Sequence, residues 1–209
     1  MKKLLSLTLA IVMVFLMVAC NATPNSDDKG NDKAEFSRGK IEGDVYINEF
    51  LGFEFTKPES WVYSTDEEIA ALVNLSVDTI LGDNFKDALK NNPSVYDMMV
   101  TDLVTRSNIN VGYENLAKTF ATNITIKQYV DMVKKQLSNV EGMTTTFSDN
   151  MESVKLGEAE FTKVVCNTTA SGVSMTQVYY LQKVDEYMCF VIVTIPSGYN
   201  VEEIEAMFK

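Results

Sequence analysis

The sequence predicts an α+β domain built on a single antiparallel sheet, with helices packed on the faces of that sheet. Three observations lead to this prediction. Several segments place apolar residues at every second position, two segments pair a capping box with a helical apolar stripe, and the last third is a series of strand-like segments separated by turn residues. The chain shows no internal repeat and no second linker, so one domain is expected, over residues 44–209.

Two short strands are expected to open the domain. Val45–Ile47 is the first, and Gly52–Lys57 is the second, with Phe53 and Phe55 on one face. Pro58 ends the second strand because proline has no N–H group to donate to a sheet. Trp61 and Tyr63 follow directly in the sequence.

A helix is expected next. Thr65 and Glu68 have the spacing of a capping box, and the apolar residues that follow predict a helix through about Ile80. Residues 81–93, which contain a glycine, two consecutive asparagines and Pro93, predict a loop with room for one further helical turn.

Two strands joined by a turn are predicted at residues 96–101 and 108–114. In the second strand, apolar and polar side chains alternate, which is typical of a half-buried strand. The apolar face carries Ile109, Val111 and Tyr113. The polar face carries Asn108, Asn110 and Glu114. These three polar residues are the candidate binding residues of the sequence, and the alternative is that they simply face water.

A second helix is predicted after Thr125, which forms a capping box with Gln128. One helical stripe is apolar and consists of Ile126, Tyr129, Val130, Val133 and Leu137. Gly142 would end this helix.

The last third predicts an antiparallel meander closed by a helix. Residues 144–147 and 152–155 are the weaker strand candidates, and residues 160–168, 174–183 and 187–195 are the stronger ones. The expected turns are Ser171-Gly172 and Asp185-Glu186, and Pro196 ends the last strand. Asn200 would cap a short final helix that packs back on the sheet.

The N-terminus predicts export and lipid anchoring. Lys2 and Lys3 precede an uncharged apolar run at residues 4–18, which is the order of a secretory signal, here residues 1–19. The run is shorter than the roughly 20 residues that a membrane-spanning helix needs. Ala19 before Cys20 resembles the lipobox of bacterial lipoproteins, whose cysteine sulfur receives a diacylglyceryl group.

This resemblance implies a protein held on the extracytoplasmic side of the cell membrane, with the lipid as its membrane contact. Met17 replaces the leucine that is usual three places before the cysteine. The alternative is an uncleaved anchor with an incidental thiol. Residues 20–43 are rich in polar residues and predict a flexible tether, whose reach as a random coil would be about 25 to 30 Å.

Composition excludes several functions. The formal net charge is −11, and two of the lysines lie in the predicted signal, so nucleic acid is not expected as a partner. The sequence has no histidine, which excludes Ser-His-Asp and Cys-His catalysis and zinc sites with histidine ligands. We therefore predict no catalytic residues, no cofactor and no metal site.

The opening of the domain resembles a known family. The pattern Tyr46-x-Asn48, followed by Gly52-Phe53-x-Phe55-x-x-Pro58-x-x-Trp61, is similar to the start of PsbP-like proteins. The order of predicted elements is similar over almost all of residues 44–209. This resemblance implies an αβα sandwich, shared with certain nuclear import factors. It also implies a non-catalytic accessory or assembly role through partner binding, sometimes assisted by a bound ion.

The two cysteines beyond Cys20 are predicted to be free. If the strand at residues 174–183 lies between the other two strong strands, Cys166 and Cys189 are two strand spacings apart, about 9.6 Å. A disulfide tolerates about 7 Å between Cα atoms. Two buried thiols are therefore expected.

Three functions remain open, in order of preference. The first is a non-catalytic binding or assembly module that engages an envelope protein through a sheet face or edge. The second is capture of a small molecule or cation, favoured by the acidic composition and by the polar face of residues 108–114. The third is a hydrolase that uses carboxylates, which would need two carboxyl groups in one cleft.

Overall fold

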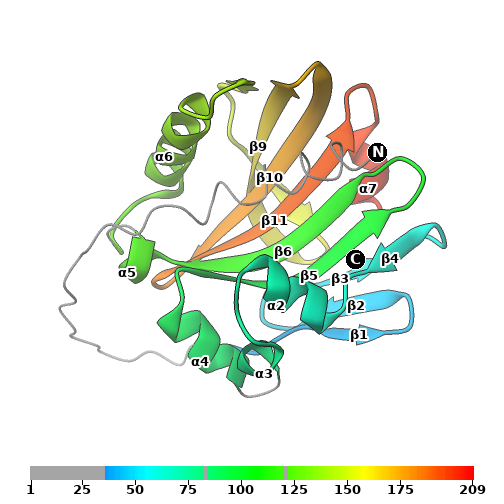
Figure 1. The fold of residues 1–209 in the computed structure, drawn as a ribbon, viewed down its shortest axis with the longest axis vertical. Coiled ribbons are helices and arrows are strands. Elements are labelled where there is room, and N and C mark those ends of the chain that lie inside the picture. The colour runs from blue at the N-terminus through cyan, green and yellow to red at the C-terminus, as the bar shows by residue number, and fades with distance from the viewer. Residues whose placement is uncertain (1–35, 82–83, 120–121) are drawn as a thin grey trace.

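A computed structural model describes residues 36–209, except 82–83 and 120–121 (Figure 1). Within these residues the strands form two antiparallel sheets, so the prediction of a single sheet is wrong. The smaller sheet has three strands: β1 (Lys40–Glu42), β2 (Val45–Asn48) and β3 (Phe53–Thr56). The larger has eight: β4 (Trp61–Tyr63), β5 (Ser94–Asp102), β6 (Asn108–Asn115), β7 (Met143–Phe147), β8 (Glu152–Leu156), β9 (Ala159–Ala170), β10 (Val173–Val184) and β11 (Tyr187–Pro196). Its order is β4-β5-β6-β11-β10-β9-β7, and β8 pairs with the half of β9 that β7 leaves open.

The two sheets stay separate because both edges of β3 are occupied. One edge pairs with β2. On the other edge Phe208 bridges Phe55, and Glu54 and Lys209 exchange backbone hydrogen bonds of 2.8 and 2.9 Å. Gly157 allows this closure, because a Cβ atom there would clash with the Lys209 carbonyl and its φ is +60°. The chain therefore continues into β4, which joins the larger sheet beside β5.

The helices cover both faces of the larger sheet, in two groups (Figure 1). α6 (Ile126–Ser138) packs on β7 and β10. On the opposite face lie α4 (Asn84–Asn91) over β5 and β6, α2 (Asp66–Leu72) over β5, and the small sheet. α3 (Val77–Ile80), α5 (Leu116–Thr119) and α7 (Val201–Glu205) are single turns. We call the sheet face under α6 the α6 face, and the other the opposite face. Because helices lie on both faces, the domain has the layered α+β architecture that was expected.

Both predicted capping boxes are confirmed. The Thr65 side chain accepts from the Glu68 N–H while the Glu68 carboxylate accepts from the Thr65 N–H, and Thr125 and Gln128 do the same. The helix after Thr65 is shorter than predicted, because the chain leaves helical geometry at Asn74, whose φ is +57°.

The expected loop at residues 81–93 contains helix α4 instead. Phe85, Ala88 and Leu89 are buried and have helical spacing, so packing against the sheet stabilises this segment as a helix. None of the helices in the described part of the chain is long and apolar enough to cross a membrane. The predicted signal and Cys20 lie outside the described residues.

Two further predictions can be compared with the structure. β10 lies between β9 and β11, and Cys166 and Cys189 are both buried and free, as predicted. Within the segment expected to be a tether, Lys40–Glu42 forms β1 and Phe36 packs against buried aromatic rings.

Candidate functional site

β6 is the strand on which the sequence placed its candidate binding residues. The prediction that this strand is half-buried is wrong. Every residue from Ile109 to Asn115 is buried, and Asn108 is partly buried. On one face α4 packs over β6, and on the other Tyr129 of α6 contacts Glu114, so alternation between apolar and polar residues does not mean alternation between core and water. Asn108, Asn110 and Glu114 do share one face, the α6 face.

Gly112 divides these three residues into two separate groups. A Cβ atom at Gly112 would lie 2.5 Å from Cζ of Phe190, so the Phe190 ring lies directly over this position. The ring also packs edge-on against Tyr96, with 5.6 Å between centroids. Asn108 and Asn110 lie on one side of these rings and Glu114 on the other.

The first group belongs to an amide–hydroxyl cluster on β6, β11 and β10. We define this cluster as Asn108, Asn110, Thr194, Gln177 and Tyr179. Asn110 Nδ2 donates to Asn108 Oδ1 at 3.0 Å, the Tyr179 hydroxyl donates to Gln177 Oε1 at 3.1 Å, and Gln177 Nε2 donates to Thr194 Oγ1 at 3.4 Å. Asn110 is 1% exposed, yet its Oδ1 has no hydrogen-bond partner.

The register shows that the cluster occupies two neutral rows across the sheet. One row runs through Val62, Thr101, Asn108, Thr194, Gln177, Cys166 and Phe147. The next row runs through Met99, Asn110, Ile192, Tyr179 and Val164. Neither row contains a charged side chain.

Glu114, the third predicted residue, forms a buried pair with α6. The Tyr129 hydroxyl donates to Glu114 Oε2 at 2.5 Å. Burial raises the pKa of Glu114 from 4.5 to about 7, and hydrogen bonds from Tyr129 and Thr119 oppose this rise. Ser94 lies opposite Glu114 in the register and is 4% exposed, and its Oγ has no hydrogen-bond partner.

A small apolar hollow lies between α6 and the sheet, beside Glu114's partner Tyr129. Its lining consists of Tyr129, Val130, Val133, Phe147, Val164, Tyr179 and Leu181. Tyr179 thus contributes its ring to the hollow and its hydroxyl to the amide–hydroxyl cluster.

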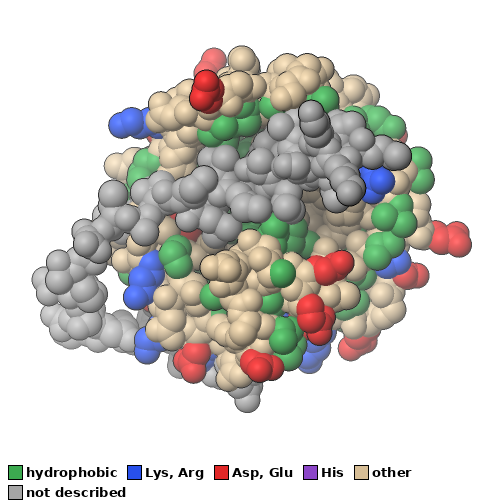
Figure 2. Space-filling model, viewed as in Figure 1, with side chains coloured by type: hydrophobic (Ala, Val, Ile, Leu, Met, Phe, Trp, Pro, Cys, Tyr) green, Lys and Arg blue, Asp and Glu red, His purple; other side chains and the backbone are tan. Residues whose placement is uncertain are grey.

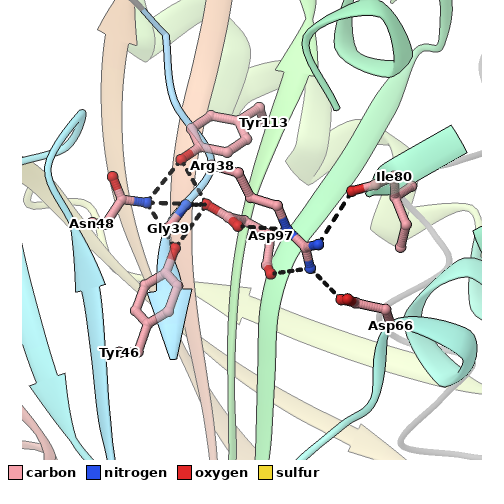
Figure 3. Close-up of polar contacts among 8 residues, drawn as sticks. All are labelled: Arg38, Gly39, Tyr46, Asn48, Asp66, Ile80, Asp97 and Tyr113. Carbon is pink, nitrogen blue, oxygen red and sulfur yellow. Dashed lines mark hydrogen bonds and ion pairs between the residues drawn. The ribbon is translucent and has the colours of Figure 1, made fainter. Parts of the chain in front are cut away.

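A second buried carboxyl group lies on the opposite face, at Asp97 (Figure 3). Its Oδ2 accepts hydrogen bonds from the Gly39 N–H, the Tyr46 and Tyr113 hydroxyls and Asn48 Nδ2, at 2.8 to 3.1 Å. We call this arrangement the Asp97 hub. Burial raises the pKa of Asp97, and the Gly39 N–H, the Tyr46 hydroxyl and the positive charge of Arg38 oppose this rise.

Arg38 connects the Asp97 hub to the helices. Its Nε donates to Asp97 Oδ1 at 3.3 Å, one terminal nitrogen donates to the Ile80 carbonyl at 3.2 Å, and the other pairs with Asp66 (Figure 3). Both carboxylate oxygens of Asp97 therefore have hydrogen-bond partners within the domain. The hub is a structural centre and leaves no position for a ligand.

Sequence reasoning missed Asp97, although a signal was present. The residue stands inside the otherwise apolar run Val95–Val100, where a charge needs a buried partner. The partner could not be read from the sequence, because Arg38 lies within the segment predicted to be a flexible tether.

The described surface also has an apolar corner, which we define as Val62, Leu103 and Val104. Their exposed fractions are 49%, 56% and 78%. They are neighbours, because Val62 pairs with Thr101 and the Leu103 N–H donates to the Ser60 carbonyl at 3.1 Å. Figure 2 shows hydrophobic side chains at this corner, over β4 and the β5–β6 hairpin.

Among the residues described, no three His, Cys, Asp or Glu side chains lie close enough together to hold a metal ion. Asp97 and Glu114, two of the buried carboxyl groups, lie on opposite faces of the sheet and so do not form the paired carboxyls of a glycosidase cleft.

The comparisons with known proteins show a similarity of fold alone, and only to solved structures. No family model and no curated protein matches the chain. It is similar to the solution structure of cyanobacterial PsbP (CyanoP) from Synechocystis sp. PCC 6803, at 10% identity and a TM-score of 0.47, over 87% of this chain and 97% of that one. It is also similar to a crystal structure from Bacteroides thetaiotaomicron VPI-5482, at 13% identity and a TM-score of 0.40, over 76% of this chain and 44% of that one. Both TM-scores are below 0.5, so neither likeness says anything about what this chain does.

Proposed function

We propose that this chain is a lipid-anchored protein on the extracytoplasmic side of the cell membrane, and that its domain is a non-catalytic binding or assembly module of the envelope. The sequence of residues 1–20 supports the anchor. The resemblance of the opening strands to PsbP-like proteins agrees with an accessory role.

The observation that carries the binding role is the apolar corner. Three large aliphatic side chains lie together on the surface beside β4, the strand at the end of the larger sheet. Single exposed aliphatic residues are common, but adjacent ones on a sheet edge are typical of a surface that a protein partner covers. The proposed partner is an envelope protein with an apolar patch of its own.

The anchor is tested with Cys20→Ser in the full chain. We expect the unchanged protein to incorporate radiolabelled palmitate and the variant to incorporate none. Equal incorporation by the variant would refute lipid attachment at Cys20.

The partner is tested by photo-crosslinking in intact cells. A photoreactive amino acid replaces Val104 in the apolar corner, and the matched control replaces Lys155, which is exposed on β8 at the other end of the sheet. We expect one defined crosslinked protein from position 104 and none from position 155. Equal products from both positions, or none from position 104, would contradict the proposal.

A second candidate function is the binding of a small molecule. The observation that favours it is the buried Asn110 Oδ1 without a partner, within the amide–hydroxyl cluster.

A further inference from the structure

We propose that β7, the strand at one end of the larger sheet, pairs edge to edge with β7 of a second copy of this chain, so that the two sheets join in an antiparallel dimer. β7 lies at the other end of the sheet from the apolar corner. This inference goes beyond the proposed anchoring and partner binding and depends on neither.

The open edges of the described strands differ in charge. β1, β4, β7 and β8 each pair with a single neighbouring strand, so each has one free edge. β1 carries Lys40 and Glu42, and β8 carries Glu152 and Lys155, and charged side chains of this kind hinder pairing with another chain. β4 has no charge but only three residues, whereas β7 is an uncharged stretch of five, Met-Thr-Thr-Thr-Phe. In the described part of the chain, β7 is therefore the longest edge without this protection.

The backbone of β7 offers hydrogen-bonding groups at this edge. The Ser148 N–H, directly after the strand, donates to the Val165 carbonyl of β9 at 2.8 Å. Because N–H groups along a strand point alternately to its two sides, the Thr146 N–H also points to β9. The N–H and C=O groups of Thr145 and Phe147 therefore point away from the sheet. A second strand in antiparallel orientation can pair with them as β9 pairs on the other side.

The side chains of β7 match those of a reversed copy of the same strand. If Thr145 lies opposite Thr145 of the second copy, Thr144 lies opposite Thr146, and Met143 lies opposite Phe147. Met143 and Phe147 are half-buried on the α6 face, while Thr144 and Thr146 are exposed on the opposite face. Threonine pairs across two strands are favourable, and so are contacts between a methionine sulfur and an aromatic ring. Both faces of the joined sheet would keep their character.

The charge of the protein favours this edge as a contact between identical chains. The net charge is −11, so two copies repel each other where acidic surfaces meet. No charged residue occurs from Gly142 to Ser148. Glu141 and Asp149, just beyond the strand, come opposite each other in this register, so added salt should screen their repulsion and strengthen the pairing. A strand of five residues buries little area, which makes the dimer a weak one.

The experiment traps the dimer by disulfide formation in the full-length chain in detergent. Opposite residues at a hydrogen-bonded position have Cα atoms about 5.5 Å apart, which suits a disulfide. Under mild oxidation we expect Thr145→Cys to give about ten times more covalent dimer than Thr144→Cys, whose two copies would lie roughly 8 Å apart. The unchanged chain, with Cys20, Cys166 and Cys189, gives the background.

A mixture of two variants tests the register. Thr144→Cys and Thr146→Cys should each give little covalent dimer alone. Their mixture should give the mixed dimer, because these two positions would lie about 4.5 Å apart across the pair. Added salt should leave this yield unchanged or raise it.

The sharpest variant is Thr145→Pro, introduced into both members of this mixture. The Thr145 N–H points away from β9, so proline there removes no bond within the sheet and suits an edge strand. We expect the mixed dimer to fall to background while the urea midpoint changes little. Thr146→Pro is the matched control, because it removes a bond to β9 and should lower the urea midpoint clearly.

Four results would overturn the proposal. The first is a dimer yield for Thr145→Cys no higher than that for Thr144→Cys, which random collision would produce. The second is a mixture of Thr144→Cys and Thr146→Cys that gives no more dimer than either alone. The third is a yield that falls when salt is added, which would mean that ionic contacts hold the chains together. The fourth is an equal loss of stability in Thr145→Pro and Thr146→Pro, which would mean that the edge is not free.

Discussion

Asp97 and Glu114 are buried carboxyl groups on neighbouring strands of one sheet, but their surroundings differ. Asp97 accepts hydrogen bonds from four groups at one oxygen and pairs with Arg38 at the other. Glu114 has the Tyr129 hydroxyl as its partner on α6, and no cationic side chain in the described part of the chain stabilises its charge. The opposite face thus holds a compensated charge, and the α6 face holds a carboxyl group whose pKa is near neutral.

The two faces are therefore expected to differ in role: the opposite face holds segments of the fold together, and the α6 face can respond to its surroundings. A fully bonded ion pair fixes the segments that supply its donors, here the N-terminal segment, β2 and β6, to the acceptor Asp97 on β5. A carboxyl group with a raised pKa, on the same face as two unpartnered polar atoms, leaves that face with unused hydrogen-bonding capacity. We therefore expect substitutions on the opposite face to change mainly stability, and substitutions on the α6 face to change the response to pH and ligands.

The largest expected effect is that of Arg38→Met. It leaves Asp97 buried without its cation, and breaking one partner of a buried pair costs about 3 to 5 kcal/mol. Urea unfolding at pH 7 measures this change. Lys127→Met is the control, because the Lys127–Asp131 pair is exposed and should matter little. A loss below about 1 kcal/mol for Arg38→Met would mean that the hub is not a structural centre.

Glu114→Gln tests the other carboxyl group. The folded-state pKa, about 7, lies above the unfolded value of 4.5, so the native protein loses stability as pH rises from 4.5 through about 7. Glutamine cannot ionise and can still accept from Tyr129. We expect the variant to be more stable than the unchanged protein by about 3 kcal/mol at pH 8 and equally stable near pH 4.5.

Urea unfolding across this pH range measures the difference. Glu158→Gln, a change at an exposed position, is the control and should give a curve parallel to that of the unchanged protein. A constant difference between Glu114→Gln and the unchanged protein at all pH values would contradict the near-neutral pKa.

Tyr129→Phe should have a smaller effect of the same origin. It removes the hydroxyl that donates to the Glu114 carboxylate, which costs about 1.5 to 3 kcal/mol when the acceptor is charged. The loss should therefore be greater at pH 8 than at pH 5. The control is Tyr63→Phe, whose half-buried hydroxyl bonds the Asp44 carbonyl at 3.1 Å. If Tyr129→Phe lost the same free energy at both pH values, the pair would not be the pH-dependent contact.

The smallest expected effect is that of Phe36→Ala. The half-buried Phe36 ring stacks on Phe85 at 5.7 Å and meets Tyr113 edge-on at 4.9 Å, next to the Asp97 hub. Its removal should cost about 1 to 2 kcal/mol in urea unfolding. Tyr199→Ala, at a 52% exposed position, should cost much less. No change in stability for Phe36→Ala would mean that the segment before residue 44 adds nothing to the stability of the domain, as the predicted domain start at residue 44 implies.

Local signals in the sequence predicted the elements well, and contacts between distant residues decided the rest. Capping boxes depend on neighbouring residues, so Thr65 and Thr125 could be identified from spacing alone. The turn at Ser171-Gly172 could be identified in the same way, and both residues there have positive φ. The separation into two sheets depends on residues 207–209 occupying the edge of β3, which no local pattern reveals.

The candidate site was predicted in part. Alternation placed Asn108, Asn110 and Glu114 correctly on one face, but it could not indicate that this face is covered or that Gly112 and Phe190 divide it. Gln177, Tyr179 and Thr194 join Asn110 only through the order of strands β6, β11 and β10. Strand order is a long-range property, so the composition of the cluster could not be read from any one segment.

The pairing of Glu54 with Lys209 has a consequence for the order of folding. β3 gains its second neighbour only from residues at the far end of the described chain. Contacts between residues so far apart in sequence form late and slowly. During synthesis, the small sheet therefore stays incomplete until residues 207–209 have emerged, and a chain that must cross a membrane would remain open for threading until that moment.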